Sequence, residues 1–170
     1  MATVTVSFTP LPAHVRTARF IAASVARRAG VAEAVLDEIR LAVSEACSLA
    51  VRFHLAQAPL APVELRLTDL DAEFSVQVVD SVQRAAPDAN TEFTFDLGDE
   101  SSGSVPASNG SAAGAGGQDW PGFAGADGLD TIDLRGHERI GLAVISGLVD
   151  DVAVEYLDSG SVVTMTWPIG

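Results

Sequence analysis

The chain has 170 residues, of which 48% are apolar and 19% charged, a composition typical of a single globular domain and not of a disordered chain. Its formal net charge is −13, and all ten of its basic residues are arginines, so a basic surface for nucleic acid is not expected. The apolar stretches are too short to cross a membrane and the opening MATVTVSF lacks the pattern of a secretory signal, so we expect a cytoplasmic protein.

The N-terminal part of the sequence predicts a strand followed by a helix. Thr3–Phe8 alternates apolar and polar residues and is rich in β-branched types, which predicts a strand with one buried face. A helix is predicted over Ala13–Ala29, after Pro12 and before Gly30, which is a typical C-terminal stop. The arginines of this helix fall opposite its small apolar residues and form either a solvated face or a contact for an acidic partner.

A second helix is predicted over Glu33–Ala56. Its apolar stripe, at spacings of three and four, consists of Leu36, Ile39, Val43, Cys47 (or Ala46) and Ala50. Cys47 is the only cysteine and lies on this stripe, so we expect a buried thiol and not a reactive one. Glu45 and Leu49 are four residues apart and therefore lie one turn from each other on a common face.

The remaining elements complete a two-layer arrangement. A hairpin is predicted from the strands Val63–Thr68 and Phe74–Val79, a helix over His137–Val149, and two final strands over Val152–Leu157 and Ser161–Trp167. The core stripe expected for the last helix consists of Ile140, Val144, Ile145 and Leu148. We therefore predict an α+β fold with the helices on one face of a mixed, mostly antiparallel sheet.

The segment from about 84 to 136 differs from the rest of the chain. Gly98–Gly117 consists mainly of glycine, serine and alanine, and such a run cannot bury enough apolar surface to offset the entropy of ordering it. We predict one domain over residues 1–170 that is interrupted by a disordered, lid-like insertion at 84–136.

Several motifs resemble a known family. LAVSEACSLAV at Leu41–Val51, the opening FTPLPAHVRTARFIA, the late IGLAVISGLVDDVAV and the final GSVVTMTW resemble the anti-sigma factor serine kinases of the GHKL, or histidine-kinase-like, ATPase superfamily. The resemblance covers nearly the whole chain outside the insertion. It implies a Bergerat-type ATPase fold, a bacterial regulator of transcription and a homodimer.

The resemblance also implies roles for individual residues. In the family, the glutamate at the Glu45 position is a general base, and an asparagine at the Leu49 position holds the Mg²⁺ that bridges the phosphates of ATP. The aspartate at the Asp80 position accepts a hydrogen bond from the adenine amino group, and a hydroxyl at the Ser161 position helps to hold adenine through water. Glycines at the start of the late helix, among them Gly141, let backbone amides approach the phosphates.

The sequence departs from this pattern at the metal and phosphate positions. Leu49 has no oxygen for Mg²⁺, so Mg²⁺ binding is not expected, whereas ATP binding stays open. The loop after Asp80 has Val82 and Arg84 where the family has glycines, and the late box has Arg139 in place of its first glycine. Arg139 is a candidate for direct contact with a phosphate.

Each candidate residue also has a simpler interpretation that involves no nucleotide. Glu45 would be a solvated helix residue, and Asp80 would cap the turn after its strand. Gly141 would allow close helix packing, and Ser161 would be an ordinary strand hydroxyl. The three histidines lie on different elements and have no metal-ligand spacing.

Three functions remain open, and we favour the first. It is an anti-sigma-factor-like protein that binds a sigma factor or an anti-anti-sigma partner, with its ATP-dependent kinase activity weak or lost. The second is an active serine/threonine kinase that phosphorylates such an antagonist with Glu45 as base. The third is a dimerisation module without such a partner.

Overall fold

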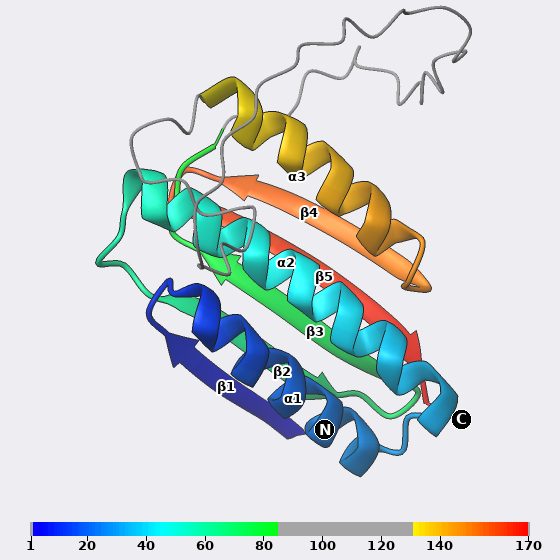
Figure 1. Cartoon of the computed structure of the whole chain (residues 1–170). Helices are drawn as coiled ribbons and strands as arrows, with labels where there is room; N and C mark the ends of the chain where they lie inside the picture. The colour runs from blue at the N-terminus through cyan, green and yellow to red at the C-terminus, as the bar shows by residue number, and fades with distance from the viewer. Residues whose placement is uncertain (1, 85–130, 170) are drawn as a thin grey trace, which may run out of the picture. The chain divides into compact units, whose positions relative to one another are not determined.

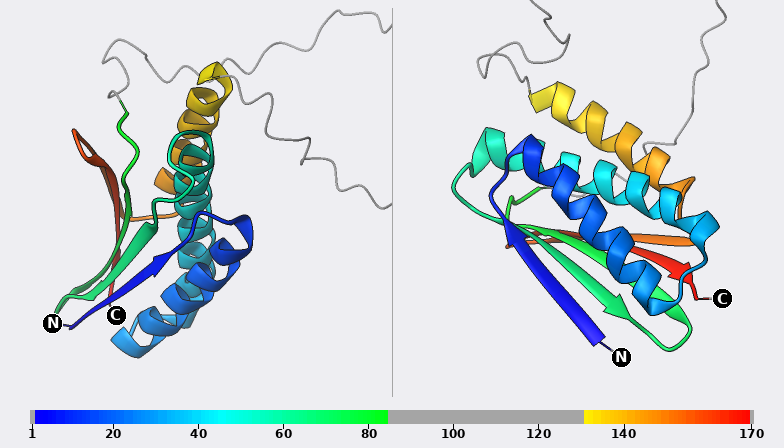
Figure 2. Two further views of the ribbon diagram at one scale, coloured as in Figure 1. Left: turned by 90° about the vertical axis from the view of Figure 1, so that its left-hand side faces the viewer. Right: turned by 60° about the horizontal axis from the view of Figure 1, so that its bottom comes forward.

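The computed structural model of the protein describes residues 2–84 and 131–169 (Figure 1). In chain order the elements are β1 (Ala2–Phe8), α1 (Pro12–Ala29), the short 3₁₀ helix η1 (Glu33–Val35), α2 (Leu36–Gln57), β2 (Val63–Asp69), β3 (Glu73–Asp80), α3 (Thr131–Ser146), β4 (Asp151–Leu157) and β5 (Gly160–Pro168). The α-helices lie on one face of the sheet, as the turned views of Figure 2 show. The predicted two-layer α+β fold is confirmed.

The described strands form one sheet in the order β1-β2-β3-β5-β4, and every neighbouring pair is antiparallel. The sequence predicted a mixed sheet, but the described strands contain no parallel pair, because the β4–β5 hairpin folds back and places β5 beside β3. The register of this central pair sets Asp80 opposite Ser161 at one end of the sheet. Two of the predicted site residues are therefore neighbours on adjacent strands.

Helix α2 supplies much of the core between the two layers. All five residues of its predicted stripe are buried, and they pack against the inward-facing residues of the central strands. Cys47 is one of them, and burial raises the pKa of its thiol to about 12. The thiol is therefore protonated at neutral pH, in agreement with the prediction of a buried and unreactive cysteine.

Helix α3 differs from its prediction in extent and in orientation. It begins at Thr131 and ends at Ser146, whereas the sequence predicted a helix over His137–Val149. The predicted core residues Ile140 and Val144 are exposed. Of the predicted core residues in α3, Ile145 is buried, as expected. The other buried positions of the helix are Leu134, Glu138 and Gly141, which follow helical spacing with Ile145.

The physical reason for the error in α3 is the inward position of Glu138. A sequence pattern assigns a glutamate to the solvent face, but this carboxylate is buried between ionic and hydroxyl partners that come from distant parts of the chain. Residues 131–136, which the prediction placed in the insertion, form the first turns of the helix. Residues 85–130, the rest of the predicted insertion, lie outside the described residues.

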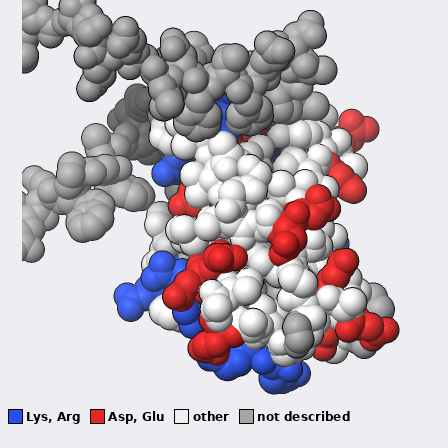
Figure 3. All heavy atoms as spheres, turned by 90° about the vertical axis from the view of Figure 1, so that its right-hand side faces the viewer, with Lys and Arg blue, Asp and Glu red and all other residues white. Residues whose placement is uncertain are grey.

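Charged side chains are unevenly spread over the surface. Figure 3 shows one face, on which acidic side chains are spread widely, while most of the visible basic ones lie toward the bottom and a few lie near the top. None of the described helices is both long enough and apolar enough to cross a membrane.

Candidate functional site

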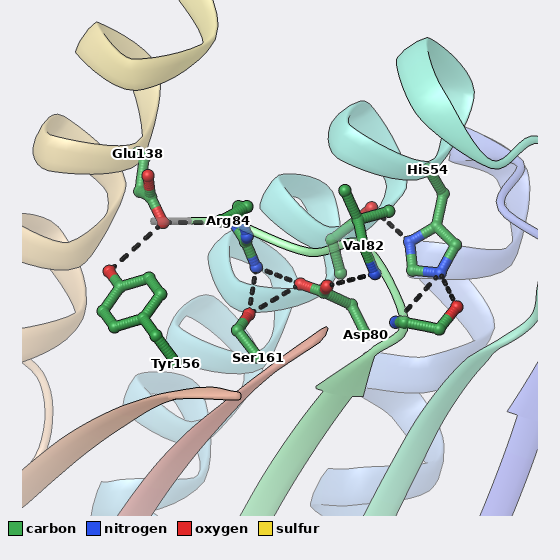
Figure 4. A network of polar contacts seen from close by, with 9 residues as sticks. His54, Asp80, Val82, Arg84, Glu138, Tyr156 and Ser161 are labelled. Atoms are coloured by element: carbon green, nitrogen blue, oxygen red, sulfur yellow. Dashed lines mark hydrogen bonds and ion pairs between the residues drawn. The ribbon is translucent and has the colours of Figure 1, made fainter. Parts of the chain in front are cut away.

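A group of polar side chains lies where β3 ends and β5 begins, beneath helices α2 and α3 (Figure 4). Asp80 is its centre. One carboxylate oxygen, Oδ1, accepts the backbone N–H of Val82 at 3.0 Å, and the other, Oδ2, accepts the Ser161 hydroxyl at 2.9 Å. Asp80 and Ser161 are both buried, so the structure brings together two residues that the sequence singled out separately.

The guanidinium of Arg84 completes this group. Its Nη2 donates to Asp80 Oδ2 and to Ser161 Oγ, and its Nη1 donates to Glu138 Oε1 at 3.1 Å. The Arg84 side chain is only 7% exposed, so these are buried, charge-assisted contacts and not surface ion pairs. We call Asp80, Arg84, Glu138, Tyr156 and Ser161 the Arg84 cluster.

The face of the guanidinium lies on an aromatic ring. The Cζ atom of Arg84 is 3.9 Å from the centroid of the Phe53 ring in α2, a close cation–π contact. Phe53 is buried together with Val82 and Leu134 in a small apolar cluster beside the guanidinium. The site therefore suits a planar group: carboxylate and hydroxyl oxygens accept hydrogen bonds from its edge, and an aromatic ring covers its face.

The chain after β3 is held by His54 of α2. This histidine is fully buried; its Nδ1 lies 2.8 Å from the carbonyl of Ala50, and its Nε2 lies 3.4 Å from the backbone nitrogen of Ser81. Because a carbonyl only accepts, the hydrogen-bond network assigns the ring hydrogen to Nδ1 and leaves Nε2 to accept from Ser81. His54 thus fixes the start of the segment that leads to Arg84.

Tyr156 of β4 is the fifth member of the cluster, and its hydroxyl donates to Glu138 Oε1 at 3.3 Å. Burial, and after it the negative charge of Glu138, raise the pKa of Tyr156 to about 12. The neutral phenol is therefore favoured in the folded protein. Its contribution to stability is fully present below the ordinary pKa of 10.0 and is lost as the pH rises through about 12.

Tyr156 is the only tyrosine, so ultraviolet absorption of the phenolate reports on this residue alone. We expect its titration in the folded protein to have a midpoint near 12. Glu138→Gln should lower the midpoint, because it removes a neighbouring negative charge. Glu155→Gln, on the exposed side of the same strand, should leave it unchanged. A midpoint near 10 in the unaltered protein would show that the hydroxyl is not shielded.

A second part of the site lies between α2 and α3, where Leu49 contacts Gly141. A Cβ atom built on Gly141 would lie 2.8 Å from Leu49 Cδ1, and Leu49 is itself buried. The two helices therefore approach closely at this point, and the leucine side chain fills the space over the glycine. This geometry supports the interpretation of Gly141 as a packing residue.

A model of the histidine kinase-like ATPase domain family matches residues 8–167, which include both parts of the site. The chain belongs to this family. A search of curated proteins found no significant match. Membership in an ATPase domain family suggests ATP binding.

The side chains of this ATPase domain do not fit the metal. Mg²⁺ requires oxygen ligands in a nearly octahedral arrangement, and Leu49 places a branched apolar group at the position where the resemblance implies a metal-binding asparagine. Among the described residues, no group of three or more His, Cys, Asp or Glu side chains is arranged to hold a metal ion. We therefore derive no step through Mg²⁺.

The polar side chains that the resemblance assigns to adenine already have partners within the chain. The resemblance gives Asp80 the adenine amino group as its partner, but here its two oxygens accept the Val82 N–H, the Ser161 hydroxyl and the Arg84 guanidinium. Ser161 likewise contacts Arg84. The two residues to which the resemblance assigns adenine therefore both contact the Arg84 side chain.

The two other candidate residues are Glu45 and Arg139. Glu45 is half-buried on α2, one turn before Leu49, and the contacts among the described residues include no ion pair or hydrogen bond from its carboxylate. Arg139 is exposed on α3, next to Glu138. Among the described residues, Glu45 therefore makes no ion pair or hydrogen bond with the cluster around Asp80.

Sequence reasoning missed the contributions of Phe53, His54, Glu138 and Tyr156. Each lies on a different element from Asp80, and no spacing in the sequence connects them to it. Arg84 was noticed only as a departure from a glycine loop. The one feature of the sequence that could have indicated this role is that Arg84 follows Asp80 by only four residues, which is close enough for an ion pair.

Proposed function

We propose that this ATPase domain is an anti-sigma-factor-like regulatory protein that binds a sigma factor or an anti-anti-sigma partner. In this proposal it acts through its protein surface. The kinase activity of the anti-sigma factor serine kinases, which it resembles, is weak or lost in this chain. The observation that carries the proposal is the packing of Leu49 against Gly141, at the position where those kinases hold a metal ion.

The chemistry of phosphoryl transfer explains why this observation matters. Negative charge on the transferred group and on the leaving group is neutralised mainly by metal ions and positively charged side chains. An aliphatic side chain supplies no such charge and also excludes the water that would otherwise coordinate a metal. Glu45 alone would supply a general base, but no group would neutralise the charge of the γ-phosphate that is attacked.

A surface suited to a protein partner lies on the outer side of α1 and α2. A hollow of about 290 Å³ there is lined by Arg19, Phe20, Asp37, Arg40, Leu41 and Ser44. Phe20 and Leu41 are each nearly half exposed, and the charged groups beside them are Arg19 and the ion pair of Arg40 with Asp37. Such a mixture favours a partner segment with apolar and acidic side chains.

A second candidate function, an active serine kinase, is favoured by the retention of Glu45 on the half-buried face of α2. The two candidates are separated by incubating the purified protein and its co-purifying partner with ATP labelled at the γ-phosphate and Mg²⁺. We expect no transfer to the partner above the level of a Glu45→Gln variant. Transfer that disappears in Glu45→Gln would overturn the proposal in favour of the kinase.

Partner binding is tested on the surface itself. Phe20→Ser should weaken retention of the co-purifying sigma factor or antagonist protein, because it removes an exposed apolar contact. Leu60→Ser is the matched control, since Leu60 is 95% exposed and lies outside this hollow. Absence of any such partner from the purified protein would favour a dimerisation module instead.

A further inference from the structure

The Arg84 cluster has the properties of a filled binding pocket. The Arg84 side chain contacts Asp80 on β3, Ser161 on β5 and Glu138 on α3 (Figure 4). It also lies over the ring of Phe53 on α2, so it joins four elements. A surface arginine that only balances charge does not need this set of contacts. They surround a flat group on its edge and on its face.

We propose that Arg84 is a built-in ligand of this ATPase domain, whose guanidinium occupies the base end of the ancestral nucleotide pocket. The side chain keeps adenine nucleosides out and holds α3 to the sheet without a nucleotide. This inference rests on family membership and on the Arg84 contacts. It deepens the proposed loss of nucleotide chemistry, because it assigns the loss of adenine binding to one residue, Arg84.

The hydrogen-bond chemistry of the two groups supports the substitution of one for the other. A guanidinium is planar and presents N–H donors at its edge, as does the amino edge of adenine. Asp80 Oδ2 and Ser161 Oγ accept from Arg84, and the ring of Phe53 covers the guanidinium face. An adenine ring would need the same acceptors, so it and Arg84 exclude each other.

The charge of the pocket explains why a cation stays in it. Asp80 and Glu138 are both buried, and Arg84 is the cation that contacts both of them. Its withdrawal would leave two buried carboxylates without a counter-charge, which is strongly unfavourable. Arg84 Nε is buried without a hydrogen-bond partner among the described atoms, so the fit is good at the two Nη atoms and incomplete at Nε.

The backbone of the segment between Asp80 and Arg84 is held so that the Arg84 side chain lies against Asp80. The Val82 N–H binds Asp80 Oδ1, a local turn of the kind aspartate favours, and His54 holds the backbone of Ser81. Arg84 stands where the resemblance places a glycine. A glycine there would have no side chain to enter the pocket, and the acceptors would be left for a ligand.

The test uses adenosine, which has no phosphate and needs no metal, so that it probes the base end alone. In calorimetric titration Arg84→Gly should bind adenosine, whereas the unaltered protein should show no binding at concentrations at least roughly tenfold above the Kd of that variant. Asp80→Asn in the Arg84→Gly background should remove that binding. Equal binding by the unaltered protein and Arg84→Gly, or no binding by a folded Arg84→Gly, would overturn the proposal.

A second measurement does not depend on the folding of a variant. In the unaltered protein, the guanidinium hydrogens of Arg84 should exchange with water far more slowly in nuclear magnetic resonance spectra than those of Arg66, whose side chain is 46% exposed. Exchange of Arg84 as fast as that of Arg66 would exclude a stably filled pocket. The kinase assay with Glu45→Gln concerns the phosphate end, so either proposal can fail while the other stands.

Discussion

Arg84→Met should lower the free energy of unfolding by about 3–5 kcal/mol, because it leaves the carboxylates of Asp80 and Glu138 buried without their cation. Methionine retains much of the length of the side chain, so the loss reports on charge and hydrogen bonds more than on an empty cavity. Chemical denaturation followed by tryptophan fluorescence measures it, since Trp167 is buried in the core.

The matched control is Arg66→Met. Arg66 forms an exposed ion pair with Glu64, and exposed pairs contribute about 0–1 kcal/mol, so this variant should be close to the unaltered protein in stability. Asp80→Asn combined with Arg84→Met should be less destabilised than the sum of the single changes, because the two residues share one network. A loss for Arg84→Met no larger than that for Arg66→Met would show that the buried network does not form.

The elements that the sequence predicted well are those in which local pattern and burial agree. Helix α2 has its five stripe residues in the core, and the strands alternate between the core and the outer face as expected. These features follow from periodicity alone, since one apolar face must be covered. Family resemblance then placed Asp80 and Ser161 in a common site, and the register of β3 and β5 puts them opposite each other.

The errors come from side chains whose surroundings are set by distant residues. Glu138 points into the protein because Arg84 and Tyr156 are there to receive it, and this moves the buried face of α3 away from Ile140 and Val144. A pattern read along one helix contains no information on such partners. The role of Arg84 was hidden for the same reason, because its four anchoring contacts come from four elements.

The two altered ends of the site have a common physical feature. At the metal end the side chain of Leu49 fills the space beside Gly141, and at the base end the guanidinium of Arg84 occupies the acceptors. In both places an internal group takes the position that the resemblance assigns to part of a ligand. The polar side chains of Asp80 and Ser161 are thereby hydrogen-bonded within the fold.

Gly160→Ala should destabilise the protein by several kcal/mol, because β5 and the end of β3 approach each other too closely for a side chain. Gly160 has φ +139°, a conformation that costs other residues about 1–3 kcal/mol. Its added Cβ would lie 1.9 Å from the carbonyl oxygen of Asp80, so the backbone has to move, at a further cost of about 1–3 kcal/mol. Thermal and denaturant unfolding measure the total.

Gly136→Ala is the control for this change. Gly136 lies in α3 with nothing within 4 Å of the added atom, and alanine is favoured over glycine in a helix, so stability should stay the same or rise slightly. In Gly160→Ala the displaced backbone is that of Asp80 and Ser81, so the Tyr156 titration should also shift as the Arg84 cluster loosens. Unchanged stability in Gly160→Ala would mean that β5 does not approach Asp80 in this way, and the pairing of Asp80 with Ser161 on which the site depends would have to be abandoned.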